Sequence, residues 1–151
     1  MKVFALWCWN ATRGRTFWFV LTLVLLAACT TTTGPVDLGG TAWQLVKFQG
    51  GDGTTLAPDD RTKYTIEFLS DGAVAMRIDC NRARGAWKSP GPSQLALGPL
   101  AVTRVLCPPG SLHDRIVKDV SYVRSYVIRN GHLFLALMAD GGVYEFEPRK
   151  P

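Results

Sequence analysis

Apolar and polar residues alternate one by one along much of the chain after residue 40, and this alternation restricts the fold more than any other feature. It is clearest in 64–69 and 74–78, which are separated by Ser70-Asp71-Gly72. A period of two is typical of strands with one buried face. The short polar connection predicts an antiparallel hairpin. Strands and helices do not alternate along the sequence, so we do not expect a parallel sheet.

Other segments also have strand character, and the loops between them contain Gly and Pro. These segments are 41–48, 84–88, 94–97, 100–106, 126–129, 132–137 and 143–147, and 50–62 is expected to be a loop. The segment 132–137 contains consecutive apolar residues, as does Val127-Ile128. Both faces of such strands must be covered, so we expect one face to line a barrel interior and the other to meet a helix or a partner.

The period changes once, after Pro108-Pro109-Gly110. Ser111 with Asp114 resembles a capping box, and the residues that follow place one apolar face at helical spacing: Leu112, Ile116, Val120 and Val123. We therefore expect a mostly β (α+β) fold. It would be a curled antiparallel sheet or cracked β-barrel of about eight strands, with one helix inserted late, at 112–124.

Residues 1–28 have the composition of a secretion signal. A basic segment without acidic residues precedes an apolar run, 16–28, which is shorter than the roughly 20 residues of a spanning helix. The run leads into Leu26-Ala27-Ala28-Cys29, which resembles the lipobox of bacterial lipoproteins. We expect cleavage before Cys29 and lipidation of its thiol. An ordinary signal peptide with an incidental Cys, or an uncleaved anchor, is the alternative.

The segment 29–37 is polar and repetitive, which predicts a flexible tether between the lipidated Cys29 and a folded domain at 38–148. In lipoproteins of this kind, Asp directly after the lipidated Cys favours retention in the inner membrane, whereas this chain has Thr30. We therefore expect a protein anchored in the cell envelope, at the outer membrane and facing the periplasm.

The charge of the chain is ordinary once the signal is set aside. The chain has 17 basic and 12 acidic residues; three basic residues lie in the signal, so 14 against 12 remain, a net charge of +2. Nucleic acid needs a clustered basic face, so we expect no nucleic-acid partner. We expect a monomer that meets the membrane through Cys29 and binds an envelope protein or an apolar ligand.

The four cysteines have different expected roles, according to their positions in the chain. Cys8 belongs to the signal and Cys29 takes the lipid, which leaves Cys80 and Cys107 as an even pair in an oxidising compartment. We predict a disulfide between them. The alternatives are a metal site with His113, whose spacing fits no standard zinc pattern, and a nucleophilic Cys with a His base. His113 and His132 are the only histidines, each in a turn-like setting.

Several motifs together resemble the META domain, the group that includes the heat-inducible HslJ lipoproteins. The resemblance spans roughly 38–148, with its pieces in the expected order: Gly40-Thr41-Ala42-Trp43-Gln44-Leu45-Val46, Cys80-Asn81-Arg82 followed by Gly85, Thr103-Arg104 followed by Cys107-Pro108, and Tyr144-Glu145-Phe146. Ile78-Asp79 stands where the family commonly has small residues. The resemblance implies a small β-rich envelope protein linked to stress or drug tolerance and in some organisms to virulence or motility, without a settled enzymatic activity, a metal or a cofactor. Its fold is said to be similar to that of the pilotins, lipoproteins that bind acyl chains.

The singled-out residues each have a structural interpretation and a functional one. Trp43 and Trp87 could stack on a ligand, but core positions are the more frequent role. Asn81 could be catalytic, or could take a left-handed conformation or bond the backbone. Arg104 could bind an anion, pair with Asp79 or Glu67, or lie in solvent.

Two functions remain open. Because no catalytic constellation stands out, we expect a non-catalytic interaction and stress-tolerance module and not an enzyme. The alternative is a pilotin-like carrier or chaperone that holds an apolar ligand or peptide in the barrel. A filled interior favours the first, and an apolar cavity of ~300 Å³ or more favours the second.

Overall fold

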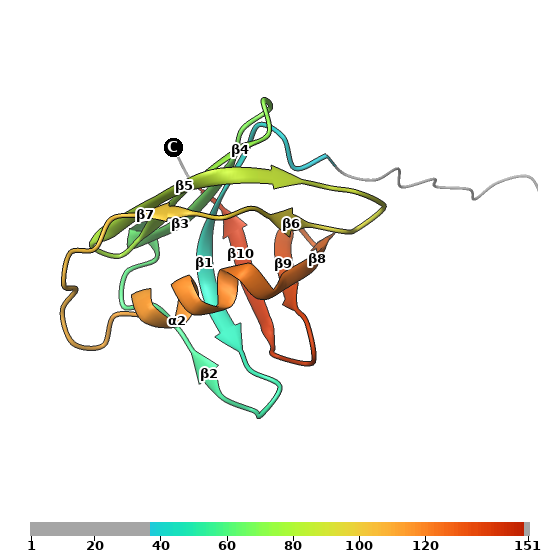
Figure 1. Ribbon diagram of the computed structural model, residues 1–151. Helices are drawn as coiled ribbons and strands as arrows, with labels where there is room; N and C mark the ends of the chain where they lie inside the picture. Colours follow the sequence, from blue (N-terminus) through green and yellow to red (C-terminus); the bar gives the residue numbers. More distant parts are fainter. Residues whose placement is uncertain (1–36, 150–151) are drawn as a thin grey trace, which may run out of the picture. The chain divides into compact units, whose positions relative to one another are not determined.

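The predicted alternation forms a curled antiparallel sheet in the computed structural model, which describes residues 37–149 (Figure 1). The main path of the sheet has the order β6-β5-β4-β3-β1-β10-β9-β8, while β2 pairs with β1 and β7 with β5. The strands are β1 (Thr41–Gln49), β2 (Thr55–Leu56), β3 (Tyr64–Phe68), β4 (Ala73–Ile78), β5 (Asn81–Lys88), β6 (Ala96–Leu97), β7 (Ala101–Val102), β8 (Val123–Arg129), β9 (His132–Leu137) and β10 (Val143–Pro148). The helical segments are η2 (Arg61–Lys63), α2 (His113–Asp119) and η3 (Val120–Tyr122).

The two ends of the sheet are joined by the segment before β6. Leu95 N–H donates to Arg124 O (3.0 Å), and Tyr126 N–H donates to Ser93 O (2.9 Å). These bonds bring the β5–β6 end of the sheet against β8 and leave few open edges. The prediction of a cracked, nearly closed β-barrel with one late helix is therefore confirmed.

Strand β10 lies between β1 and β9, although β1 is the first strand of the sequence. The β1–β10 pairing runs from Trp43 opposite Pro148 to Gln49 opposite Val143, with an irregularity between Leu45 and Lys47. The central part of the sheet is thus built from segments about one hundred residues apart in the sequence.

The core fills the concave side of the sheet. One residue in two along β3 and β9 is buried there, as the alternation requires. Helix α2 contributes the buried Ile116 to the same core, so the helix covers the concave side. Of the two covers expected for the opposite face of β9, a helix or a partner, α2 is therefore not the one. On that face Phe134 lies under the Arg129 guanidinium, 5.0 Å from the ring centroid, and Val127 is exposed.

The helix is shorter than predicted. It begins at His113 and ends at Asp119, with one 3-10 turn after it, and Val123 is the first residue of β8. Pairing explains the early end: Val123 lies opposite Leu137, and Met138 N–H donates to Tyr122 O. The capping box does not form either, because Ser111 Oγ accepts from His113 N–H while Asp114 contacts His113 Nδ1.

Two other segments differ from the prediction. The expected loop 50–62 contains β2 and most of η2, and the expected strand 100–106 shrinks to β7 while β5 begins three residues early, at Asn81. Side-chain pairing between β5 and the chain after β7, described below, causes the second difference. Within residues 37–149 no helix is long and apolar enough to cross a membrane.

Candidate functional site

Asn81 lies fully buried at the start of β5 and fastens the chain after β7 to the sheet. Its Oδ1 accepts hydrogen bonds from Val105 N–H (2.7 Å) and from the Thr103 hydroxyl (2.8 Å). Its Nδ2 donates to Val105 O (2.8 Å). The amide therefore satisfies both backbone polar groups of Val105, as a neighbouring strand would. Of the sequence interpretations, backbone bonding describes Asn81, and the left-handed residue is Asp79, with φ 58°.

A disulfide joins Cys80 to Cys107, as the sequence predicted, with Cα atoms 5.5 Å apart. The Asn81 amide nitrogen lies 3.3 Å from each sulfur. Because both sulfurs are bonded to each other, neither is a thiolate nucleophile or a metal ligand in this state. Among the described residues no group of three His, Cys, Asp or Glu side chains could hold a metal ion.

These contacts hold in place a loop whose tip is apolar and exposed. Arg82 N–H donates to Thr103 Oγ1, and Thr103 N–H donates to Arg82 O. Val105 is 60% exposed and Leu106 is 96% exposed, although Asn81 and the disulfide fix the residues on either side of Leu106. The loop thus presents a large apolar side chain from a backbone that is fixed on both sides.

Gly85 lets the chain before β7 cross β5 closely. A Cβ at this position would lie 2.8 Å from Pro99 O and 2.5 Å from Leu100 Cδ2. Such distances are too short for a side chain, so the motif glycine is explained by packing. It permits Leu100 to reach the edge of a groove beside α2.

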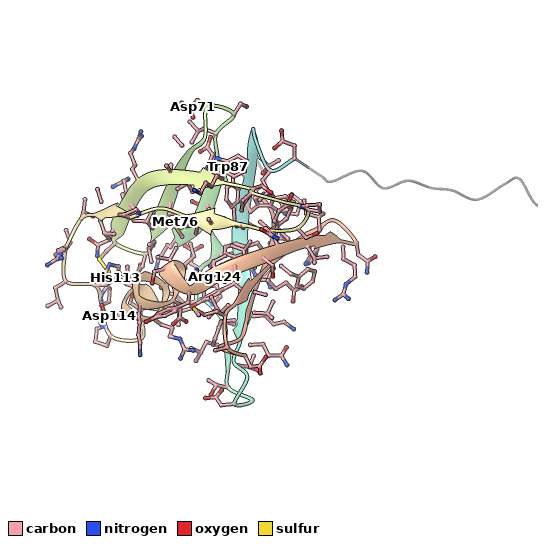
Figure 2. All side chains as sticks on the ribbon, turned by 45° about the vertical axis from the view of Figure 1, so that its right-hand side comes forward. Asp71, Met76, Trp87, His113, Asp114 and Arg124 are labelled. Atoms are coloured by element: carbon pink, nitrogen blue, oxygen red, sulfur yellow. A yellow bond between two sulfur atoms is a disulfide. The ribbon has the colours of Figure 1, made fainter. Side chains whose placement is uncertain are left out.

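The groove lies between this loop and the start of α2, and its volume is about 780 Å³. Figure 2 shows His113 and Asp114 at this end of the helix. A second recess of about 440 Å³ continues along the helix, and the two share Leu100, Val102 and Val117. His113 Nε2 is buried without a hydrogen-bond partner among the described residues. Apolar side chains of the loop and of α2 line the groove together with the polar side chains of Arg104, Ser111, His113 and Asp114.

The barrel interior, in contrast, is filled. The space between α2 and the sheet has a cavity volume of about 30 Å³, close to the volume of one water molecule in the liquid. Ile116, Val120 and Tyr144 are among the side chains that fill it. A ligand of drug size needs about ten times that volume.

A second polar cluster, which the sequence analysis did not identify, fastens α2 to the sheet. The buried Asp119 accepts hydrogen bonds from Arg115 Nε (2.5 Å) and from the Tyr144 hydroxyl (2.8 Å). Burial, followed by the bond to Asp119, raises the pKa of Tyr144, and the Asp119 hydrogen bond raises the pKa of Arg115. Arg115 also stacks on Phe48, 4.4 Å from the ring centroid. The four-residue spacing of Arg115 and Asp119 was the one available sequence signal.

The remaining predicted residues are scattered. Trp43 is buried and donates to Thr41 Oγ1, while Trp87 packs edge-to-face on Phe68. Arg104 lies after β7 and is exposed, without the ion pair to Asp79 or Glu67 that was considered, and Arg82 and Pro108 are also exposed. His132 begins β9, where its ring contacts Glu145. Cys29 lies outside the described residues.

Comparisons with known proteins agree with this architecture. The fold is similar to an NMR structure of a protein from Burkholderia xenovorans, with a TM-score of 0.64 and 20% identity over 82% of this chain and 96% of that one. It is also similar to the crystal structure of a DUF4847 family protein from Bacteroides vulgatus, with a TM-score of 0.56 and 16% identity over 76% and 96% of the two chains. A search of curated proteins finds no match. The META domain matches residues 36–151, and the chain therefore belongs to the META domain family.

Proposed function

We propose that this protein is a lipid-anchored envelope protein whose META domain works by binding, without catalysis. In this proposal Cys29 carries the lipid, 30–37 is the tether, and the folded domain engages an apolar segment of another envelope protein in the groove beside α2. The protein faces the periplasm at the outer membrane and contributes to stress tolerance by this contact.

The observation that carries the proposal is the contrast between the filled interior and the open groove. The space under α2 has a volume of about 30 Å³, and the groove beside the loop has about 780 Å³. The family-motif residues Asn81 and Gly85 are engaged in holding the groove wall. These residues shape a surface and do not converge on a reacting group. Such an arrangement favours a binding function over catalytic turnover.

The alternative, a pilotin-like carrier, needs space for an acyl chain inside the barrel. The interior volume is about a tenth of the ~300 Å³ that such a ligand requires. The observed packing therefore favours the interaction module.

Photocrosslinking in cells tests the groove. A photoreactive amino acid replaces Val117, which lines both recesses. The matched control replaces the neighbouring, exposed Lys118. We expect a discrete crosslinked product from position 117 and much less from 118. Equal products from both positions, or none from 117, would count against the groove as the binding surface.

The lipid anchor has a separate test. Wild-type precursor should incorporate radiolabelled palmitate and fractionate with membranes, and Cys29→Ser should do neither. Cys8→Ser is the matched control and should behave like wild type, because Cys8 lies in the segment removed. Palmitate incorporation by Cys29→Ser would refute lipidation at this position.

A further inference from the structure

The tip of the disulfide loop combines ordered backbone with exposed aliphatic side chains. Leu106 is 96% exposed and Val105 is 60% exposed. Val105 is bonded through both backbone groups to Asn81, and Cys107 is bonded to Cys80. Val105 and Leu106 also line the groove beside α2, and both side chains remain exposed there. The hydrogen bonds of the buried Asn81 and the disulfide together hold Leu106 in an exposed position.

Arginines without acidic partners lie beside this tip. Arg82 is joined to Thr103 through the backbone and Arg104 follows it, and neither forms an ion pair with a described residue. Arg77 lies directly opposite Arg82 across the β4–β5 ladder and bonds only to the backbone carbonyls of Thr62 and Asp79. Like charges in opposed positions are destabilising, so this face favours an anionic partner.

The acidic groups in the same region do not neutralise it. Arg77, Arg82 and Arg84 share a surface recess with Glu67, but Glu67 pairs with Arg149 at 3.8 Å. Asp114 lines the groove and contacts His113. Asp60 interacts electrostatically with Arg77. The positive charge next to Leu106 therefore rests on Arg82, Arg84 and Arg104, which form no ion pair with a described residue.

We propose that the loop tip, Val105-Leu106, inserts into the headgroup region of an anionic lipid bilayer, with Arg82 and Arg104 contacting lipid phosphates. Protruding aliphatic residues flanked by arginines suit a bilayer surface, where apolar burial and attraction to anionic headgroups act together. The contact goes beyond the proposed anchor, because it would orient the domain and not merely retain it.

The domain alone suffices for the experiment. The described residues 37–149 belong to one compact unit, which holds the core and the disulfide. The similar Burkholderia structure, matched over 96% of its own chain, was solved in solution by NMR. A fragment 36–151 therefore folds independently of the signal and lacks any lipid. Thermal unfolding of each variant confirms that it is folded before vesicles are added.

Flotation with vesicles is the first measurement. We expect the fragment to bind vesicles that contain phosphatidylglycerol and to bind pure phosphatidylcholine about tenfold more weakly. Val105→Ser/Leu106→Ser should reduce binding about tenfold. The matched control is Val127→Ser, which removes an exposed aliphatic side chain of β8, and it should bind like wild type. Equal loss in the control would overturn the proposal.

The charge of the loop face is tested in the same assay. Arg82→Gln/Arg104→Gln should weaken binding to anionic vesicles about tenfold or more. Lys47→Gln/Arg129→Gln removes the same charge from β1 and β8, and it should have a much smaller effect. Equal effects of both pairs would show attraction by net charge only, and would overturn the assignment of this face.

Insertion is tested with Leu106→Trp. The fluorescence of this Trp should shift to the blue on anionic vesicles and be quenched by lipids brominated near the headgroup. The wild-type fragment has only the packed Trp43 and Trp87, and its fluorescence should not respond. Binding without quenching would indicate adsorption at the surface and overturn insertion. Crosslinking at Val117 does not depend on these results, so failure of either proposal can be recognised separately.

Discussion

Two polar networks fasten irregular parts of this molecule to the sheet, and they face different surroundings. At the β5 end, Asn81 and the disulfide hold a loop that is otherwise in solvent. At the helix, Asp119 joins Arg115 and Tyr144 beneath α2, next to the core. The first network holds an exposed backbone segment around Val105, whereas the second lies around the buried Asp119. The first network therefore shapes a surface, and the second supports the fold.

Removing the disulfide should have the largest effect. Cys80→Ser/Cys107→Ser opens a loop of about 28 residues, which is worth about 3.5 kcal/mol in the chain-entropy account. We expect a loss of that size in the free energy of unfolding, measured by urea denaturation. Urea denaturation of the wild-type domain with its disulfide intact is the control. A loss below about 1 kcal/mol would mean that Asn81 alone holds the loop.

Removing the Asn81 amide should reduce the free energy of unfolding by slightly less. Asn81→Ala deletes three hydrogen bonds to Val105 and Thr103, at about 1 kcal/mol each, so we expect a loss of about 3 kcal/mol. Hydrogen exchange at Val105 N–H should accelerate more than exchange in β9. Uniform acceleration would show that this network supports the whole fold, contrary to the comparison.

Disruption of the network beneath α2 should accelerate hydrogen exchange globally and not only near the altered residue. Tyr144→Phe leaves the buried Asp119 with one partner fewer, and we expect a loss of about 1.5 kcal/mol. Exchange should accelerate throughout the core, because α2 and β10 share this bond. Tyr122→Phe is the matched control, since Tyr122 is exposed. A change confined to α2 would contradict a global role.

The exposed ion pair of Glu147 on β10 gives a reference effect on stability for both networks. Hydrogen bonds from Gln44 and Arg61 lower the pKa of Glu147. A carboxylate whose pKa is lower in the folded state stabilises the folded protein at pH values above its unfolded pKa of about 4.3. This stabilisation is lost as the pH falls through the folded pKa. Glu147→Gln should therefore reduce stability by no more than about 0.5 kcal/mol at pH 7. The difference from wild type should disappear toward pH 2; a constant difference would exclude the ionised carboxylate as its source.

The sequence predicted the parts of the fold that depend on local pattern. Alternation located β3, β4 and β10, the apolar segment 132–137 located β9, and the even pair Cys80 and Cys107 predicted the disulfide. The end of α2 could not be predicted, because the helical spacing continues to Val123 while strand pairing with Leu137 removes that residue from the helix. Tertiary pairing overrides a weak local preference of this kind.

The candidate site was only partly predictable. The motif residues Asn81, Gly85 and Thr103 were identified, but their roles depend on contacts between β5 and a loop some twenty residues later. The exposure of Leu106 was not predictable, because the pattern there resembles a continuing strand. Asp119 was missed because a lone carboxylate on a short helix resembles any solvated charge until Tyr144 is placed beside it.

The place of β10 in the sheet has a consequence for biosynthesis. Synthesis from the amino terminus reaches β10 after every other strand, yet β10 separates β1 from β9. Until it arrives, both neighbours have unpaired edges, and the sheet is split into two incomplete halves. Non-local pairing of this kind folds slowly. A nascent chain should therefore stay open until its final strand is available, and such an open chain suits the export that our proposed function requires.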